Sequence, residues 1–356
     1  MSAEPTRETT FALSVVIPSF NSARWLPSTL GALAAAVRAA DIAVEVVVVD
    51  DGSTDDTEAV LRSLQAGFPG EVVVVRQENG GRFLARWAGI QRARSATVFL
   101  LDSRVLVAPD ALRNYVSASR VDPAQRAWNG YVVTDPASPL VGLFWEVPTH
   151  VFWGRFLRSP RPFDLTRDTF DSAPKGTGMF IARKSDLEAA FLASWPEGDA
   201  RFVSDDTKIL RHIADASSIR LEPGIAATYR PRTTLRGFVR HTFDRGTLFV
   251  DSYAGTGVVR SVVLLVLAAL PVVALAALIV LIAAGLTGLA LALVITLVVA
   301  ALSPVVVAAF NRCRPRGLLA FVVCLPVFVV PFWLGLIRGV FIHRRAFLRA
   351  RKEEFA

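Results

Sequence analysis

The chain has 356 residues, of which 53% are hydrophobic and only 20% are charged, a composition too apolar for a wholly soluble protein. The formal net charge is +8, but it is divided unevenly: 15 basic and 4 acidic residues lie from Arg230 onward, and the part before Arg230 has a balance of −3. The basic excess therefore lies beside the most apolar stretches, where it suits anionic lipid headgroups. Nucleic acid is not an expected partner, because the globular half has no basic excess to neutralise phosphates.

In the first half, short β-branched runs alternate with helical patterns. Strands are predicted at 13–17, 44–49, 72–75, 98–101 and 176–182, and helices at 26–40, 55–66, 83–93 and 207–214. This alternation predicts an α/β domain with a doubly wound, mostly parallel sheet, which binds its ligands at the carboxyl ends of the strands. We assign residues 11–229 to this domain, preceded by a disordered leader at 1–10. The segment 129–170 has no clear period and is interpreted as an acceptor-side insert.

The second half contains two long uncharged runs. The first covers 51 residues, from Ser261 to Asn311. As one helix it would extend about 76 Å, more than twice the roughly 30 Å of a hydrocarbon core. It must therefore turn, and the glycines at 285–288 predict two membrane-spanning helices, 261–283 and 289–310.

The third apolar segment, 317–337, is interrupted by Pro326 and Pro331. A third span is favoured, with a re-entrant or tilted helix as the alternative, so that residues 261–341 form an α-helical membrane domain. The Arg-rich stretch 230–260 is predicted to form interfacial amphipathic helices, and an ordinary surface helix is the alternative.

The positive-inside rule determines the expected localisation. Basic residues flank the first two spans, which places residues 11–229 on the cytoplasmic side of the inner or plasma membrane in a multi-pass protein. A third span would send the basic tail, 342–356, to the other side, against that rule.

A carboxylate pair, Asp50 and Asp51, follows the second predicted strand, and Gly52 and Ser53 come next. At the mouth of the sheet these acceptors can bind a base N–H or a ribose hydroxyl. The alternative is that they only cap the following helix.

Four blocks occur in order: IPSFN at 17–21, VVVDDGSTDDT at 47–57, ENGGRFLARWAGI at 78–90 and LLDSR at 100–104. Together they resemble the family-2 glycosyltransferases with the GT-A fold, over about residues 13–245. The resemblance implies a nucleotide-sugar donor. It also implies donor-binding roles: Pro18 and Phe20 flank the base, Asp51 binds it beside Asp50, Arg86 reaches the nucleotide, and Asp102 begins the Asp-x-Asp motif that holds ribose and a divalent metal.

The chain departs from this motif at Arg104, which replaces the second Asp. A guanidinium donates hydrogen bonds and accepts none, so binding of Mg²⁺ or Mn²⁺ becomes an open question. One hypothesis is that Arg104 itself stabilises the leaving diphosphate. A second is that Asp102 retains the metal with water and the diphosphate. A third is that Arg104 pairs with Asp51 or Asp102 in an inactive relative.

On the acceptor side, GTGMF at 176–180 resembles the glycine-containing strand that precedes the family's catalytic acid, and Ser204-Asp205-Asp206 resembles the family's Glu-Asp pair. An inverting transfer needs a carboxylate to take the acceptor's proton. Asp206 is the expected base and Asp205 supports it, with a simple helix-capping pair as the alternative. Residues 231–236 and 333–336 also resemble the exopolysaccharide branch of the family.

The expected protein is a membrane-anchored, inverting glycosyltransferase of cell-envelope glycan or exopolysaccharide synthesis. Its expected acceptor is lipid-linked or membrane-proximal. One alternative is a polyprenyl-phosphate glycosyltransferase that makes a lipid-phosphate sugar, and another is a non-catalytic scaffold that binds the donor. A homo-oligomer is compatible with the sequence and is left open.

Overall fold

The computed structural model describes residues 11–347, which fall into two compact units. Unit 1 contains residues up to 135, 160–201 and 205–230, and unit 2 contains 136–159, 202–204 and the chain from 231 onward. Residues 136–159, expected within the first domain, thus group with the C-terminal helices. The leader expected at 1–10, and residues 348–356 of the expected basic tail, lie outside the described residues.

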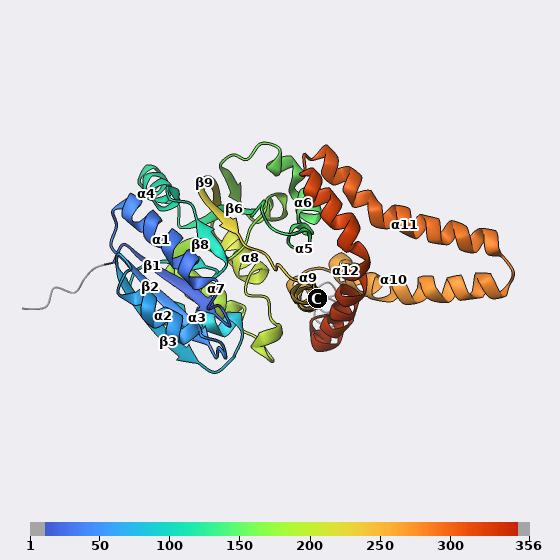
Figure 1. Ribbon diagram of the computed structural model, residues 1–356, viewed down its shortest axis with the longest axis horizontal. Helices are drawn as coiled ribbons and strands as arrows, with labels where there is room; N and C mark the ends of the chain where they lie inside the picture. Colours follow the sequence, from blue (N-terminus) through green and yellow to red (C-terminus); the bar gives the residue numbers. More distant parts are fainter. Residues whose placement is uncertain (1–10, 348–356) are drawn as a thin grey trace, which may run out of the picture. The chain divides into compact units, whose positions relative to one another are not determined.

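Unit 1 contains a nine-stranded sheet in the order β3-β2-β1-β4-β8-β6-β9-β5, with β7 paired to β9 (Figure 1). The strands are β1 (Leu13–Ser19), β2 (Val44–Asp51), β3 (Glu71–Gln77), β4 (Thr97–Leu101), β5 (Val105–Val107), β6 (Ala127–Thr134), β7 (Phe163–Leu165), β8 (Met179–Arg183) and β9 (Ile219–Tyr229). The half from β3 to β4 is parallel, as expected. Beyond it β8 runs antiparallel to both β4 and β6, so the whole sheet is mixed.

Helices cover both faces of the parallel half. The helical elements of this region are α1 (Leu26–Ala40), α2 (Thr57–Gln65), α3 (Arg82–Arg92), α4 (Ala111–Val121), α7 (Lys184–Ala193), α8 (Thr207–Ala216) and the 3₁₀ turns η1 (Phe170–Ser172) and η2 (Ala200–Phe202). Val15 and Ile17 of β1 pack in one core cluster with Leu30 of α1. Val16 points to the other face because side chains alternate along a strand. There it lies so close to Gly89 of α3 that any side chain at Gly89 would collide with it.

Unit 2 is helical. Its helices are α5 (Leu140–Leu143), α6 (Glu146–Leu157), α9 (Leu235–Tyr253), α10 (Val258–Ala283), α11 (Thr287–Phe310) and α12 (Pro315–Ile342). The last three are long and apolar enough to cross a membrane. α10 and α11 form the expected hairpin, which turns at Gly285 with φ +73° (Figure 1). Almost none of their apolar surface is buried within the protein, as expected for helices whose solvent is lipid.

The third apolar helix, α12, differs from the other two. It is one 28-residue helix that continues through Pro326 and Pro331. In its most apolar stretch, 28% of the residues are buried inside the protein. It contacts α9, α10 and α11, and Figure 1 shows it running across the base of the hairpin.

The tightest packing in unit 2 joins α12 to α9 through glycines. Gly335 lies directly against the Phe243 carbonyl, and a Cβ at Gly339 would be 2.9 Å from the Thr247 carbonyl. Because these partners advance together by four residues, the two helices run parallel. The Thr247 hydroxyl also donates to the Gly335 carbonyl at 2.9 Å. Small residues four apart allow such close approach of two backbones.

Gly335→Ala is therefore expected to destabilise unit 2 by about 1–3 kcal/mol, because the added methyl collides with backbone that cannot rotate away. Gly288→Ala is the matched control, since a Cβ there meets nothing within 4 Å. Thermal unfolding of both variants in detergent tests this. Equal midpoints would show that the glycine contact does not hold the two helices together.

The segment 136–159 packs onto the apolar helices of the same unit. Phe144 stacks on Phe321 of α12 with centroids 5.0 Å apart and also contacts Phe238 of α9. Glu146 is buried, and its carboxylate lies 3.2 Å from the Arg314 guanidinium. Burial raises the pKa of Glu146 above its ordinary value, and the charge of Arg314 opposes that shift. Of the acceptor-side insert expected at 129–170, residues 136–159 are thus part of the helical unit, and the two ends belong to unit 1.

Candidate active site

Apart from Arg86, which lies on α3, the predicted donor-side residues lie on strands β1, β2 and β4 or directly after them. These strands are neighbours and parallel, so their carboxyl ends share one edge of the sheet. Gly52, with φ +73°, turns the chain after β2, and a Cβ there would be 2.9 Å from the Asn79 nitrogen. The glycine of the DDGS block is therefore required by the backbone.

Both carboxylates of the DDGS block are buried and hydrogen-bonded. Asp50 accepts from the Ser53 N–H at 3.0 Å, which closes the turn after β2. Asp51 accepts from Gly80 N–H and Gly81 N–H, each at 2.9 Å, and from the Gln77 amide at 2.7 Å. A carboxylate has about four lone-pair positions, so Asp51 keeps one for a further donor. Base binding by Asp51 stays a prediction that this geometry permits.

The loop after β1 is tied to the loop after β2. The Asn21 N–H donates to Ser53 Oγ at 2.9 Å, and Asn21 Oδ1 accepts from the Thr54 N–H at 2.8 Å. Pro18 is buried within β1, whereas the Phe20 side chain is 44% exposed. Of the two residues predicted to flank a base, Phe20 is thus the one whose ring is accessible to a planar ligand.

A buried arginine links the predicted donor side to the predicted acceptor side. Arg86 of α3 is 1% exposed. Its Nη2 donates to Asp102 Oδ1 at 2.6 Å, and its Nη1 donates to the Asp205 carboxylate and the Thr177 hydroxyl. Because this guanidinium is committed to protein groups, its predicted contact with the nucleotide gains no support. Its geometry instead suits a residue that positions two carboxylates.

Asp205 is buried and paired twice. Besides Arg86, its carboxylate faces the Arg82 guanidinium at 3.3 Å, and the Arg82 side chain is 55% exposed. The charge of Asp205 raises the pKa of Arg82 above its ordinary value. A carboxylate held by two arginines is a poor proton acceptor, so Asp205 suits a supporting role.

Asp206 is placed differently from its neighbour. It is partly exposed and precedes α8, but among the described residues its side chain makes no hydrogen bond to the first turn of that helix. The helix-capping alternative therefore lacks its defining contact. A Cβ at Gly176 would lie 3.5 Å from Asp206 Oδ2, so the GTGMF segment and this carboxylate are neighbours. Of the two acidic residues, Asp206 has the accessibility that a general base needs.

Arg104 is turned toward the start of α1. Its guanidinium stacks on the Trp25 ring at 4.2 Å, and its Nε donates to the Arg230 carbonyl at 2.8 Å. Arg24 and Arg230 approach the same ring, at 4.2 and 4.9 Å. Burial, followed by repulsion from Arg24, lowers the pKa of Arg230 below its ordinary value. The residue at the second motif position therefore belongs to a strongly cationic cluster.

The donor set at this edge does not make a metal centre by itself. In the described part of the chain, no three His, Cys, Asp or Glu side chains come together as metal ligands. Asp102 offers one carboxylate, which Arg86 already engages. We derive no step through a metal ion.

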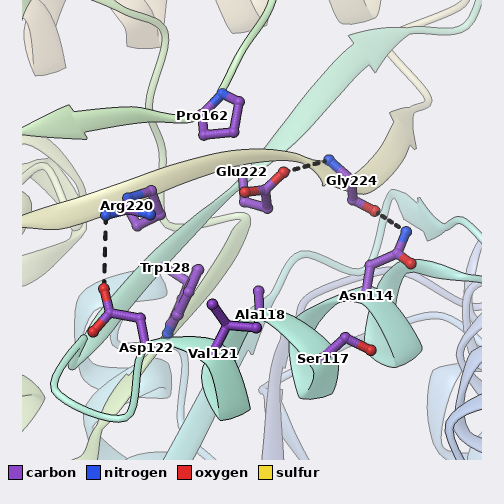
Figure 2. A pocket seen from close by; sticks show the side chains of 10 residues that line it. All are labelled: Asn114, Ser117, Ala118, Val121, Asp122, Trp128, Pro162, Arg220, Glu222 and Gly224. Atoms are coloured by element: carbon purple, nitrogen blue, oxygen red, sulfur yellow. Dashed lines mark hydrogen bonds and ion pairs between the residues drawn. The ribbon is translucent and has the colours of Figure 1, made fainter.

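Unit 1 also has a hollow of about 390 Å³ between α4, β6 and β9, which contains none of the predicted site residues (Figure 2). Its polar groups bond to one another. Arg220 lies 3.7 Å from Asp122, and Asn114 donates to the Gly224 carbonyl at 2.8 Å. We therefore do not place the active site there.

Three residues near the site were missed from the sequence. Arg82 lies inside the ENGGRFLARWAGI block, so its position was a usable signal. Trp25, which carries the arginine cluster, had no signal. The Lys175 side chain is only 8% exposed, and its burial lowers its pKa while Asp171 and Asp206 oppose the shift. A lysine beside the GTGMF segment reads as a surface residue in the sequence.

Comparison with known proteins identifies the domain. The model of glycosyl transferase family 2 matches residues 14–187. Residues 14–187 are a family 2 glycosyltransferase domain. The validoxylamine A glucosyltransferase of Streptomyces hygroscopicus subsp. jinggangensis is 37% identical over 174 residues, 44% of this chain and 40% of that protein. The undecaprenyl-phosphate 4-deoxy-4-formamido-L-arabinose transferase of Sodalis glossinidius is 34% identical over 112 residues, 31% of this chain and 34% of that protein.

These matches span less than half the length of the curated relatives. A solved structure extends the likeness of fold to nearly the whole chain. The mannosyltransferase PcManGT from Pyrobaculum calidifontis, in complex with GDP-Man and Mn²⁺, has a TM-score of 0.59 at 19% identity, covering 94% of this chain and 89% of that one. The family 2 domain with the GT-A fold, followed by apolar helices, is thus confirmed.

Proposed function

We propose that this protein is a membrane-anchored, inverting glycosyltransferase that moves a sugar from a nucleotide-diphosphate donor to a lipid-linked acceptor. The observation that carries the proposal is the hydrogen-bonded linkage Asp102–Arg86–Asp205 within unit 1. It connects the residue at the donor motif to the acidic pair on the acceptor side. Asp206, next in sequence and accessible, is the proposed base that takes the proton of the acceptor hydroxyl.

The membrane part of the proposal rests on the three apolar helices. Basic residues before α10 and after α11 favour a cytoplasmic catalytic domain in the inner or plasma membrane, by the positive-inside rule. The relative that acts on undecaprenyl phosphate supports a polyprenyl-linked acceptor. This favours the lipid-phosphate sugar as a second candidate product, beside a growing glycan on a lipid carrier.

The test is release of nucleoside diphosphate from a panel of nucleotide sugars by the full chain in native-membrane lipid, with Mg²⁺, with Mn²⁺ and with EDTA. We expect release that persists in EDTA, because the Arg104 guanidinium can neutralise the leaving diphosphate. Arg104→Ala should lower release about 10- to 100-fold, the effect of about one charge-assisted bond.

Arg24→Ala is the matched control, because it removes another guanidinium stacked at 4.2 Å on Trp25 and is expected to change release less than threefold. Abolition by EDTA with recovery on Mg²⁺ would instead assign a metal to Asp102 and reject the role of Arg104. Donor binding without release from any donor would favour the non-catalytic scaffold.

A further inference from the structure

Unit 2 contains an apolar groove between α9 and α12. Its volume is about 610 Å³, within the roughly 300–1,000 Å³ of small-molecule sites. Its lining comprises Leu235, Arg236, Val239, Arg240, Phe243, Pro331 and Leu334. Leu235 and Leu334 are 55% and 45% exposed, so the groove presents apolar side chains that the protein leaves uncovered.

Two arginines, Arg236 and Arg240, lie along the groove, whose lining surface is almost wholly apolar, so their charged ends lie at its edge rather than inside it. Arg236 and Arg240 are four residues apart on α9, so they lie on one helical face, and both are exposed. Neither forms a salt bridge with any residue between 11 and 347. Two unpaired like charges at this spacing repel each other, and an anion bound by both would relieve the repulsion.

The groove's walls are fixed to each other next to it. The Arg338 side chain of α12 donates from Nε to the Thr247 hydroxyl at 2.8 Å and lies 3.1 Å from the Asp244 carboxylate. Its guanidinium also stacks on Phe243 at 4.1 Å. With the glycine contact at Gly335, these bonds hold α9 and α12 at a fixed separation. The groove is therefore preformed, which lowers the entropic cost of filling it.

We propose that this groove binds a polyprenyl phosphate, with the apolar chain along Val239, Phe243 and Leu334 and the phosphate at Arg236 and Arg240. The inference rests on the proposed function, since it names the acceptor lipid. In a polyprenyl phosphate a single isoprenoid chain is esterified directly to the phosphate. In the groove, likewise, each arginine follows an apolar lining residue in sequence: Arg236 follows Leu235, and Arg240 follows Val239. A glycerophospholipid has two chains and a glycerol spacer, and it matches this arrangement less well.

The test measures binding of radiolabelled undecaprenyl phosphate to the full chain in phosphatidylcholine nanodiscs. Arg236→Gln/Arg240→Gln is expected to weaken binding at least tenfold, and Leu334→Trp, which fills the groove and keeps both charges, should do the same. The matched control is Arg344→Gln/Arg345→Gln, which removes two exposed charges of the same unit outside the groove. Undecaprenol without phosphate and phosphatidylglycerol serve as competitors and are expected to displace little label.

Wild-type binding in both groove variants would overturn the proposal. Equal displacement by phosphatidylglycerol would also overturn it, because the groove would then be a general site for anionic lipid. Binding does not require sugar transfer, so the catalytic proposal can fail independently. A chain that binds the lipid through the groove but transfers no sugar rejects the function alone, and one that transfers sugar with unaltered lipid binding in the variants rejects the groove alone.

Discussion

Asp206→Asn is expected to lower the rate of sugar transfer by about 10²- to 10⁴-fold, the usual contribution of a general base. The amide keeps the size of the carboxylate but cannot take the proton of the acceptor hydroxyl. Asp206 lies on the acceptor side, and Asp205, the buried neighbour, keeps its two arginine partners. Donor affinity should therefore stay within about threefold of wild type, measured by calorimetry with a non-hydrolysed donor analogue.

Asp215→Asn is the matched control, because Asp215 is an exposed carboxylate in α8, the helix that follows Asp206, and within the described chain its ion-pair partner is Arg167 at 4.0 Å. Its transfer rate should equal that of wild type. If Asp206→Asn retains more than a tenth of the wild-type rate, Asp206 is not the base. If it loses donor binding as well, the residue belongs to the donor site.

The parallel half of the fold could be predicted from the sequence because it is buried on both faces. Runs such as Val44–Val49 largely lack the alternation of apolar and polar residues that marks a half-buried strand, so they indicate a strand covered on both faces. The helix expected at 26–40 is α1 with the same bounds. The hairpin could also be predicted from the sequence, because an uncharged run of 51 residues is too long for one membrane span and must turn.

The antiparallel half could not be predicted in the same way. β9 contains Pro223 and Gly224, which in sequence indicate a turn rather than a strand. The structure accommodates them because the register of β9 against β6 shifts between Gly130 and Tyr131. A bulge of this kind depends on the partner strand, so local sequence does not reveal it.

The residues between 136 and 159 were missed for another reason. Phe144 is surrounded by aromatic rings from both α9 and α12, among them Phe238, Phe321 and Phe328. A short helix covered on several sides has no single apolar face and therefore no helical period. Its partners lie about 100 to 180 residues later in the chain, which explains why it looked like an irregular insert.

In the candidate site, too, some features could be predicted from the sequence and others could not. Motif blocks located Asp102, Arg86 and Asp205, but the contacts among them join residues up to 119 positions apart. Arg104 illustrates the limit: its identity indicated an altered diphosphate site, while its stacking on Trp25 depends on the loop after β1. Residue types could therefore be predicted from the motifs, whereas the contacts among them depend on the tertiary structure.

Arg86→Met is expected to destabilise unit 1 by about 3–5 kcal/mol, because it leaves the buried Asp205 carboxylate without its closest cation. Arg82 cannot replace it, since that guanidinium is half exposed and lies on the other carboxylate oxygen. Arg86→Lys keeps the positive charge beside Asp205, so it should recover much of the stability. Its single ammonium cannot reach Asp102 and Asp205 together. Thermal unfolding in detergent measures both variants, with Arg92→Met as a control at an exposed position of the same helix.

A purely structural role would predict that Arg86→Lys regains activity in proportion to stability. If Arg86 instead positions the two carboxylates, kcat of the folded Arg86→Lys protein should remain at least tenfold below wild type while KM for the donor changes less than threefold. That split arises because a single ammonium lacks the planar fork that holds Asp102 and Asp205 at once. A kcat restored to within twofold of wild type would show that Arg86 only stabilises the fold, and the link between donor and acceptor sides would lose its mechanistic meaning.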